Sequence, residues 1–385
     1  MSDSLSYANR CARMLTSLLL AAAPLTLADE GNKIASAADP AERALVRKDR
    51  YIALTQGASL FVREVSLASS PAGHFTPVLL LHGARVPGIA SFDLPVPGGS
   101  LAGDLAAAGH RVYIMDLRGY GFSSRPAAMN APPERSAPLM RTADAVADIG
   151  AAMRAIMQWS RSDKVSLVGW ATGGHWAGAY AAQYPRHVGR LVLYNTLYGA
   201  ADRHDTLGRG SPLDTPGNPG VFNAARFGGY RINSRASLFP AWDDSIPSAD
   251  KTRWRNDRVA QAYADAALAS DDTAYRRNPP GFRAPSGAMA DSFELAIGKK
   301  QWQAARLSMP VLIIRSAGDF WSRPEDAGAL AREAPDARLL TIPQATHFVH
   351  LDRDEAGRNQ FLTAVSRFLA SDGLPPRRDN EQARP

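Results

Sequence analysis

The stretch Val165-Ser166-Leu167-Val168-Gly169-Trp170-Ala171-Thr172-Gly173-Gly174-His175 decides the fold of this 385-residue chain. The apolar run that ends at Gly169 predicts a buried strand, and the small residues after it lead into a helical segment at 176–182. A strand that turns sharply into a helix, with glycines two residues either side of the tip, has the geometry of a nucleophile elbow. The tip of that turn normally carries the attacking side chain, and here it is Ala171. The sequence therefore predicts a nucleophile elbow whose tip residue carries only a methyl group.

Strands and helices alternate on both sides of this turn. Buried strands are expected at 77–83, 111–116, 190–194, 310–315 and 338–342, and helices at 101–108, 142–160, 325–333 and 355–370, with Thr142 as the cap of its helix. Segments 50–54 and 59–65 predict an antiparallel hairpin at a sheet edge. This alternation predicts the α/β class, with a mostly parallel, doubly wound sheet.

The alternation stops between residues 197 and 300. This region is rich in Gly and Pro as far as Asp250 and carries scattered aromatics, and its clearest helical stretch is 253–269. About a hundred residues without alternating elements predict an insertion, which we call the cap. The chain is therefore expected to divide into a first core part (38–196), the cap (197–300), a second core part (301–371) and a disordered tail (372–385).

Residues 1–37 have the pattern of an export signal with its cleavage region. Arginines precede an apolar run at 14–28, and small residues follow. The run is too short for a confident membrane span, so we expect an exported, periplasmic or secreted mature form without a stable span. A frayed amphipathic helix is the alternative. The single cysteine, Cys11, lies in this segment, so the mature form would have neither disulfides nor a catalytic thiol.

The charge pattern argues against nucleic acid as a partner. The formal net charge is +7, but acidic residues are interleaved with the arginines and no basic stripe is present. A basic balance weakly favours anionic partners or substrates. No cluster of His, Cys and carboxylates has metal-ligand spacing, so neither a metal nor another cofactor is expected.

Candidate reactive residues follow several of the predicted strands. In a parallel sheet, loops at the carboxyl ends of the strands form the site. Ala171, Asp319 and His347 each follow one strand, and His82-Gly83-Ala84 follows another. His82 is expected to have a structural role, and Ser123 and Ser124 are weaker candidates for a nucleophile.

From about residue 49 to 369 the chain resembles the α/β-hydrolase family. The resemblance rests on the elbow 169–174, on His82-Gly83, on the loop 116–123, and on Asp319 and His347 in that order. It implies a cap after the sixth strand and hydrolysis of carboxylic esters or related carbonyl substrates through a covalent serine intermediate.

The resemblance also implies a role for each matching residue. His347 would be the general base and Asp319 would hold its imidazole in one tautomer. The backbone amides of Ala84 and Thr172 would form the oxyanion hole. From their positions beside the elbow and the acid, and not from the resemblance, Trp170 and Trp321 are expected to line the pocket, with Gly83 as a further substrate contact. The cap aromatics favour a small apolar or aromatic substrate.

The departure from the family is Ala171, because a methyl group cannot attack a carbonyl. Three interpretations stay open at this point. The chain is a hydrolase that has lost its serine, or it is a serine-independent acid–base catalyst that uses His347 and Asp319, of the lyase or cofactor-free oxygenase type. The third is a non-catalytic protein that binds a small ligand under the cap. Oligomeric state is not predicted.

Overall fold

A computed structural model of the chain describes residues 44–69 and 76–370. The predicted export signal, Cys11 and the predicted tail at 372–385 lie outside these residues, so signal cleavage and export stay predictions. No helix in the two described segments is both long and apolar enough to cross a membrane.

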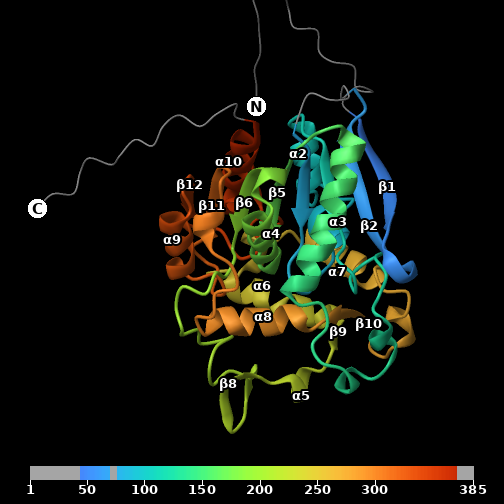
Figure 1. Ribbon diagram of the computed structural model, residues 1–385, viewed down its shortest axis with the longest axis vertical. Coiled ribbons are helices and arrows are strands. Elements are labelled where there is room, and N and C mark those ends of the chain that lie inside the picture. Colours follow the sequence, from blue (N-terminus) through green and yellow to red (C-terminus); the bar gives the residue numbers. More distant parts are fainter. Residues whose placement is uncertain (1–43, 70–75, 371–385) are drawn as a thin grey trace, which may run out of the picture. The chain divides into compact units, whose positions relative to one another are not determined.

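The core is an eight-stranded sheet in the order β1-β2-β4-β3-β5-β6-β11-β12 (Figure 1). Its strands are β1 (Leu45–Ala53), β2 (Ser59–Leu67), β3 (Val78–Leu81), β4 (Val112–Met115), β5 (Val165–Trp170), β6 (Val188–Tyr194), β11 (Val311–Ser316) and β12 (Ala337–Ile342). Every pairing from β4 to β12 is parallel, while β1 and β2 form the expected antiparallel hairpin and β2 runs antiparallel to β4. The predicted α/β class, with a mostly parallel sheet, is confirmed.

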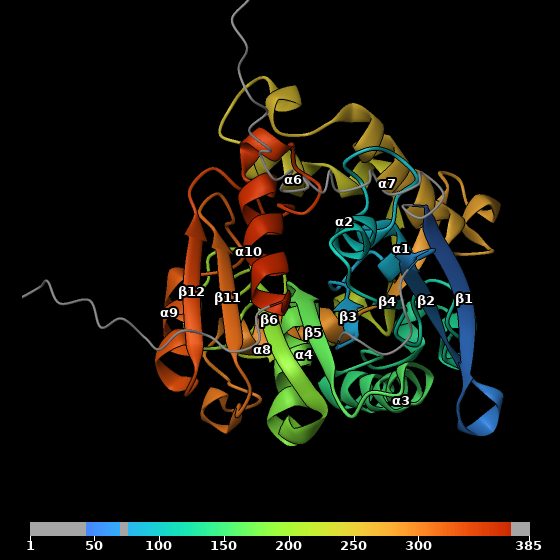
Figure 2. The same ribbon diagram turned by 90° about the horizontal axis from the view of Figure 1, so that it is seen from above.

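Helices cover both faces of the sheet (Figure 2). One face carries α3 (Thr142–Ser160), α4 (Thr172–Gln183) and α9 (Pro324–Glu333), and the other carries α1 (Gly88–Phe92), α2 (Leu101–Ala107) and α10 (Arg358–Ala370). Side chains of a strand alternate between the two cores. In β3, Leu79 and Leu81 join the α3–α4 core, whereas Val78 and Leu80 join the α2–α10 core. Burial on both faces explains why these strands read as continuous apolar runs.

Residues 197–300 lie together at one end of the sheet, at the lower end of Figure 1. They form β7 (Asp214–Thr215), β8 (Asn218–Phe222), α5 (Ala224–Phe227), β9 (Tyr230–Ser234), α6 (Pro240–Ser245), α7 (Asp257–Ala269), β10 (Gly281–Pro285) and α8 (Gly287–Ala296). The helix expected at 253–269 begins at Asp257, where the Asn256 side chain accepts a hydrogen bond from the Arg258 amide. Helix α8 and the β9–β10 pair were not predicted, because their Gly- and Pro-rich flanks obscure the pattern.

The start of α3 differs from the prediction. Thr142 is the first residue of the helix and not its N-cap residue. Its hydroxyl donates a hydrogen bond to Asp291 Oδ2 (2.8 Å), which lies in the inserted region 197–300. At the N-terminus of α3, the Asp144 side chain instead accepts a hydrogen bond from the Arg141 amide at 3.1 Å. A tertiary contact has thus taken the side chain that local sequence assigned to capping.

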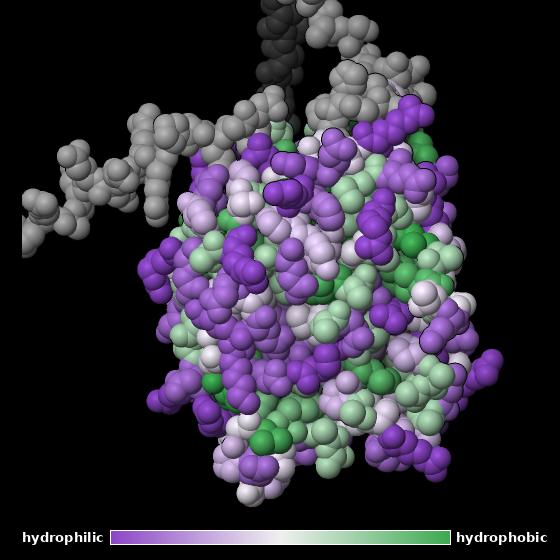
Figure 3. Space-filling model, in the orientation of Figure 1, coloured by the Kyte–Doolittle hydropathy of each residue, from purple (hydrophilic) through white to green (hydrophobic). Residues whose placement is uncertain are grey.

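The surface in Figure 3 is mostly hydrophilic, with small apolar patches between polar side chains. Most of the large apolar side chains lie in the two cores and in a small third cluster around Leu213, Phe293 and Ile297, and a few, such as Tyr275, are exposed.

Helix α4 packs so closely on β3 that only glycine fits at its second position. A Cβ on Gly173 would lie 2.3 Å from the Leu81 carbonyl oxygen, whereas a Cβ on Gly150 of α3 would meet nothing closer than 3.5 Å. We predict that Gly173→Ala lowers the free energy of unfolding by about 2 kcal/mol or more. Gly150→Ala, the control, should leave it unchanged or raise it by up to about 1 kcal/mol. If chemical denaturation gave the Gly173→Ala and Gly150→Ala variants equal free energies of unfolding, this description of the packing would be wrong.

Candidate active site

The elbow between β5 and α4 is built as the sequence indicates. Ala171 has φ 53° and ψ −120°, a conformation that non-glycine residues rarely adopt. Around it the chain is crowded, since a Cβ on Gly169 would lie 2.5 Å from the Gly173 carbonyl oxygen. The tight turn points the Ala171 side chain into a cavity that it helps to line. Backbone strain of this kind persists only where the surroundings enforce it.

Asp319 and His347 meet although they lie 28 residues apart, after β11 and β12 respectively. His347 Nδ1 is 2.8 Å from Asp319 Oδ2 and donates to it. The carboxylate also accepts from the Trp321 amide (2.8 Å) and from the Ser322 hydroxyl (2.6 Å). These bonds fix the tautomer with the proton on Nδ1, so Nε2 is left as a proton acceptor.

The loop after β3 lies against the elbow. A Cβ on Gly83 would be 3.5 Å from Ala171 Cβ, which places the Gly83 backbone beside the tip of the turn. Within the described residues, the amides of Ala84 and Thr172 donate to no acceptor. Two free amides next to position 171 are the donors that an oxyanion hole requires.

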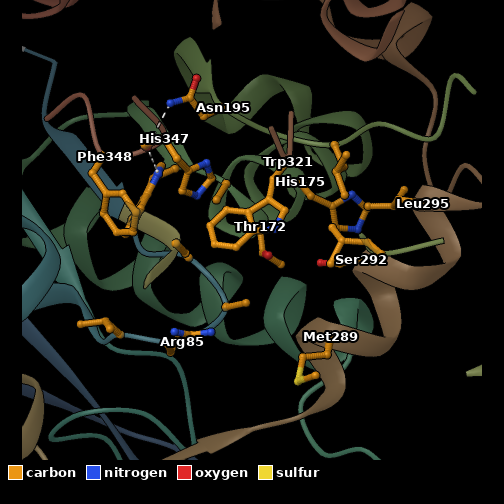
Figure 4. Close-up of a pocket in the computed structure, with 18 of the residues that line it drawn as sticks. Arg85, Thr172, His175, Asn195, Met289, Ser292, Leu295, Trp321, His347 and Phe348 are labelled. Atoms are coloured by element: carbon orange, nitrogen blue, oxygen red, sulfur yellow. Dashed lines mark hydrogen bonds between the residues drawn. The ribbon is translucent and has the colours of Figure 1, made fainter. Parts of the chain in front are cut away.

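These residues surround one cavity of about 280 Å³. Its walls are Gly83, Ala84, Arg85, Val86, Trp170, Ala171, Thr172, His175, Asn195, Leu197, Leu207, Leu213, Arg231, Leu238, Ala241, Tyr263, Met289, Ser292, Leu295, Trp321, His347 and Phe348. In Figure 4, Trp321 lies between His347 and the α8 side chains Met289, Ser292 and Leu295. Every predicted site residue lines it except Asp319, which is buried behind His347.

Comparison with known proteins agrees with this fold. The family model described as "alpha/beta hydrolase fold" matches residues 76–354. The chain belongs to the alpha/beta hydrolase fold family. The resemblance that the sequence shows to this family is thereby confirmed.

Individual relatives of this α/β hydrolase are distant. It is 24% identical over 216 residues to a Bacillus subtilis (strain 168) protein, provisionally assigned as 2-succinyl-6-hydroxy-2,4-cyclohexadiene-1-carboxylate synthase. That match covers 54% of this chain and 66% of the relative, just under two thirds of its length.

Two solved structures share the fold at low sequence identity. A mutant meta-cleavage product hydrolase from Pseudomonas fluorescens IP01, complexed with acetates, has a TM-score of 0.54 at 19% identity and covers 83% of this chain and 96% of its own. A thermophilic esterase from Thermogutta terrifontis has a TM-score of 0.53 at 20% identity, with 84% and 98% covered.

His82 takes part in the structure of the loop after β3. Its Nδ1 donates to the Gly83 carbonyl (2.8 Å), and its Nε2 accepts from the Leu117 amide (3.3 Å). Burial, opposed by the bond to Gly83, lowers the pKa of His82 to about 4. The ring is therefore neutral with both nitrogens engaged, which fits the expected structural role.

Asn195 was not singled out in the sequence, although it directly follows β6 at the carboxyl edge of the sheet. It has φ 51°, and its Nδ2 donates to the His347 carbonyl (3.0 Å) and to Ser316 Oγ (3.0 Å). Trp170 Nε1 donates to the same His347 carbonyl at 3.0 Å. Asn195 thus ties the histidine loop to β6 and β11. Its position after a strand is the signal that could have identified it.

Other candidates lie outside the cavity. Ser123 Oγ donates to the Asp116 carbonyl (2.5 Å), and Ser124 Oγ accepts from the Ser59 amide (2.9 Å), so both serve the β2–β4 connection. In the part of the chain that is described, no group of three or more His, Cys, Asp or Glu is placed to hold a metal ion.

The neutral state of His82 makes a pH-dependent contribution to stability. Its pKa is about 4 when folded against a reference value of 6.5, so the unfolded chain binds the proton first as the pH falls. His82 therefore stabilises the fold fully above pH 6.5, and this contribution of about 3 kcal/mol is lost as the pH falls to about 4. We predict that the stability difference between the wild type and His82→Gln, from denaturant titrations, shrinks across this window. A difference independent of pH would contradict the assignment.

Proposed function

We propose that this α/β hydrolase has a site for acyl transfer on carboxylic esters or related carbonyl substrates, and that Ala171 occupies the position of the attacking serine. The observation that carries the proposal is the His347–Asp319 pair at 2.8 Å, next to an elbow whose tip has the strained backbone of a nucleophile position. This arrangement supports the proposal because a serine at position 171 would share its cavity with an acid–base pair.

With a hydroxyl at position 171, each neighbouring group has a defined task. His347 Nε2 would take the hydroxyl proton as the oxygen attacks the carbonyl carbon, and would return it to the leaving group. Asp319 would stabilise the imidazolium that forms. The free amides of Ala84 and Thr172 would bind the oxyanion of the tetrahedral intermediate, at about 3 kcal/mol per donor. The present chain would bind substrate in this cavity without forming an acyl-enzyme.

The lining of the cavity favours a small substrate with an apolar or aromatic part. Trp321 packs edge-on against the His347 ring, with 4.6 Å between ring centroids, and Trp170 lies 5.3 Å from it. Leucines from the cap and from the loop after β6 complete the apolar walls. Esterase and hydrolase names among proteins of the same fold agree with this class.

Restoring the hydroxyl tests the proposal. We predict that Ala171→Ser produces hydrolysis of short aryl esters at least about a hundredfold above the unmodified chain, because a positioned nucleophile and base are then both present. Adding His347→Ala should remove this gain. Initial rates on a panel of 4-nitrophenyl and alkyl esters measure it.

A matched control is Ala241→Ser, which makes the same change in the same cavity but away from the elbow. It should stay as inactive as the unmodified chain. If Ala171→Ser folds with unchanged melting behaviour and hydrolyses none of the esters, the acyl-transfer proposal is wrong.

The intact His347–Asp319 pair beside a methyl group also favours a second function. The pair could remove a proton from a bound substrate or water, with the oxyanion amides stabilising an enolate or alkoxide. Turnover by the unmodified chain that is lost on His347→Ala would identify this serine-independent chemistry. Binding without turnover in both forms would leave the ligand-binding interpretation.

A further inference from the structure

Two arginine side chains line the cavity. Arg85 lies in the loop after β3, and Arg231 lies on β9 of the cap. Figure 4 shows Arg85 on the side of the cavity opposite Asn195. Both side chains keep part of their surface accessible, and neither pairs with a carboxylate within the described segments. The cavity itself has no Asp or Glu in its walls.

The three arginines with the least exposed surface among the described residues are neutralised. Arg283 pairs with Asp271 (2.9 Å), Arg323 with Asp326 (2.7 Å), and Arg358 with Asp354 (2.9 Å). A buried charge without a counterion is costly, so such pairing is the general rule. Arg85 and Arg231 depart from that rule at the same place.

The surroundings of Arg85 and Arg231 compensate the positive charges of these two side chains poorly. Burial, and after it the positive charge of Arg85, lowers the pKa of Arg231 to about 9. Burial lowers the pKa of Arg85 as well. The groups that offset these effects are the hydroxyls of Tyr120 and Tyr263, which are neutral near pH 7. Two guanidinium groups therefore line one cavity, and the described residues place no Asp or Glu in its walls.

Most of their hydrogen-bonding capacity is also unused. Arg231 Nη2 donates to the Ala84 carbonyl (3.2 Å) and Arg85 Nη1 to the Ser237 carbonyl (2.7 Å). The remaining guanidinium nitrogens of both residues have no acceptor among the described residues, and Arg231 Nε is buried in that state. A carboxylate would supply both the missing charge and the missing acceptors.

We propose that Arg85 and Arg231 form a binding site for a carboxylate group of the substrate, in the same cavity as Ala171 and His347. The assignment to a substrate rests on the proposed function, whereas the binding of the anion does not. Because Arg231 contacts Ala84, and Ala84 follows the glycine beside Ala171, the carboxylate would lie only a few bonds from the reacting carbonyl. The substrate class is then a short carbonyl compound or ester that bears its own carboxylate.

The test is a binding measurement on the unmodified chain, which needs no turnover. Acetate, succinate, benzoate and phenylacetate are titrated by calorimetry, each beside its neutral amide. At least one carboxylate should bind about tenfold or more tightly than its amide. Arg231→Met and Arg85→Met should each weaken that carboxylate by about tenfold to a hundredfold, as expected for the loss of a charged hydrogen bond. They should leave the amide unchanged.

Arg258→Met is the matched control, because Arg258 lies exposed on α7 and its removal changes the net charge equally. It should preserve the preference for the carboxylate. If Arg231 only positions the loop through Ala84, its variant will weaken carboxylate and amide alike, and the proposal fails. It also fails if no carboxylate binds more tightly than its amide, or if inorganic phosphate binds more tightly than every carboxylate.

The result of the carboxylate-binding experiment is independent of the result of the Ala171→Ser activity assay. An inactive Ala171→Ser form together with arginine-dependent carboxylate binding would reject the proposed reaction and keep the anion site. An active Ala171→Ser form without a carboxylate preference would support the proposed reaction and reject the anion site.

Discussion

The backbone of Ala171 is the constraint on which the site depends. A residue at φ 53° and ψ −120° is held there because β5, buried on both faces, must turn into α4 within one residue. That turn requires close contacts on both sides, and the glycines at 169 and 173 make them possible. The packing of α4 against the sheet offsets the unfavourable backbone conformation at the tip. The turn keeps this conformation although its tip carries only a methyl group.

The strained turn is useful only because other strands end beside it. Parallel strands bring their carboxyl ends to one edge, so the loops after β3, β5, β6, β11 and β12 meet although the chain between them is long. Each loop is then fixed by its own bonds. His82 holds the loop after β3, while Asn195 and Trp170 hold the backbone of His347. Several bonds thus fix each of these loops, which is the precision that the proposed reaction would need.

The cap supplies much of the wall of the cavity. It contributes most of the apolar wall of the cavity through leucines and methionine, and a single guanidinium from β9. That guanidinium bonds to the carbonyl of Ala84, so the cap is joined directly to the loop that would stabilise the oxyanion. A substrate that satisfied Arg85 and Arg231 would also be oriented toward Ala171. Binding and positioning would then arise from one contact.

The sequence by itself determined the α/β class, the elbow, and the acid and histidine at strand ends. Those features depend on local patterns: apolar runs for buried strands, glycine where a turn is tight, and chain order for the partners. It also indicated His82 as structural. It did not reveal α8, the β9–β10 pair, the anchoring role of Asn195 or the true contact of Thr142, because each depends on a partner distant in sequence. Only the tertiary structure decided that Arg85 and Arg231 share one cavity with no Asp or Glu among its described wall residues, since two arginines 146 positions apart have no local signature.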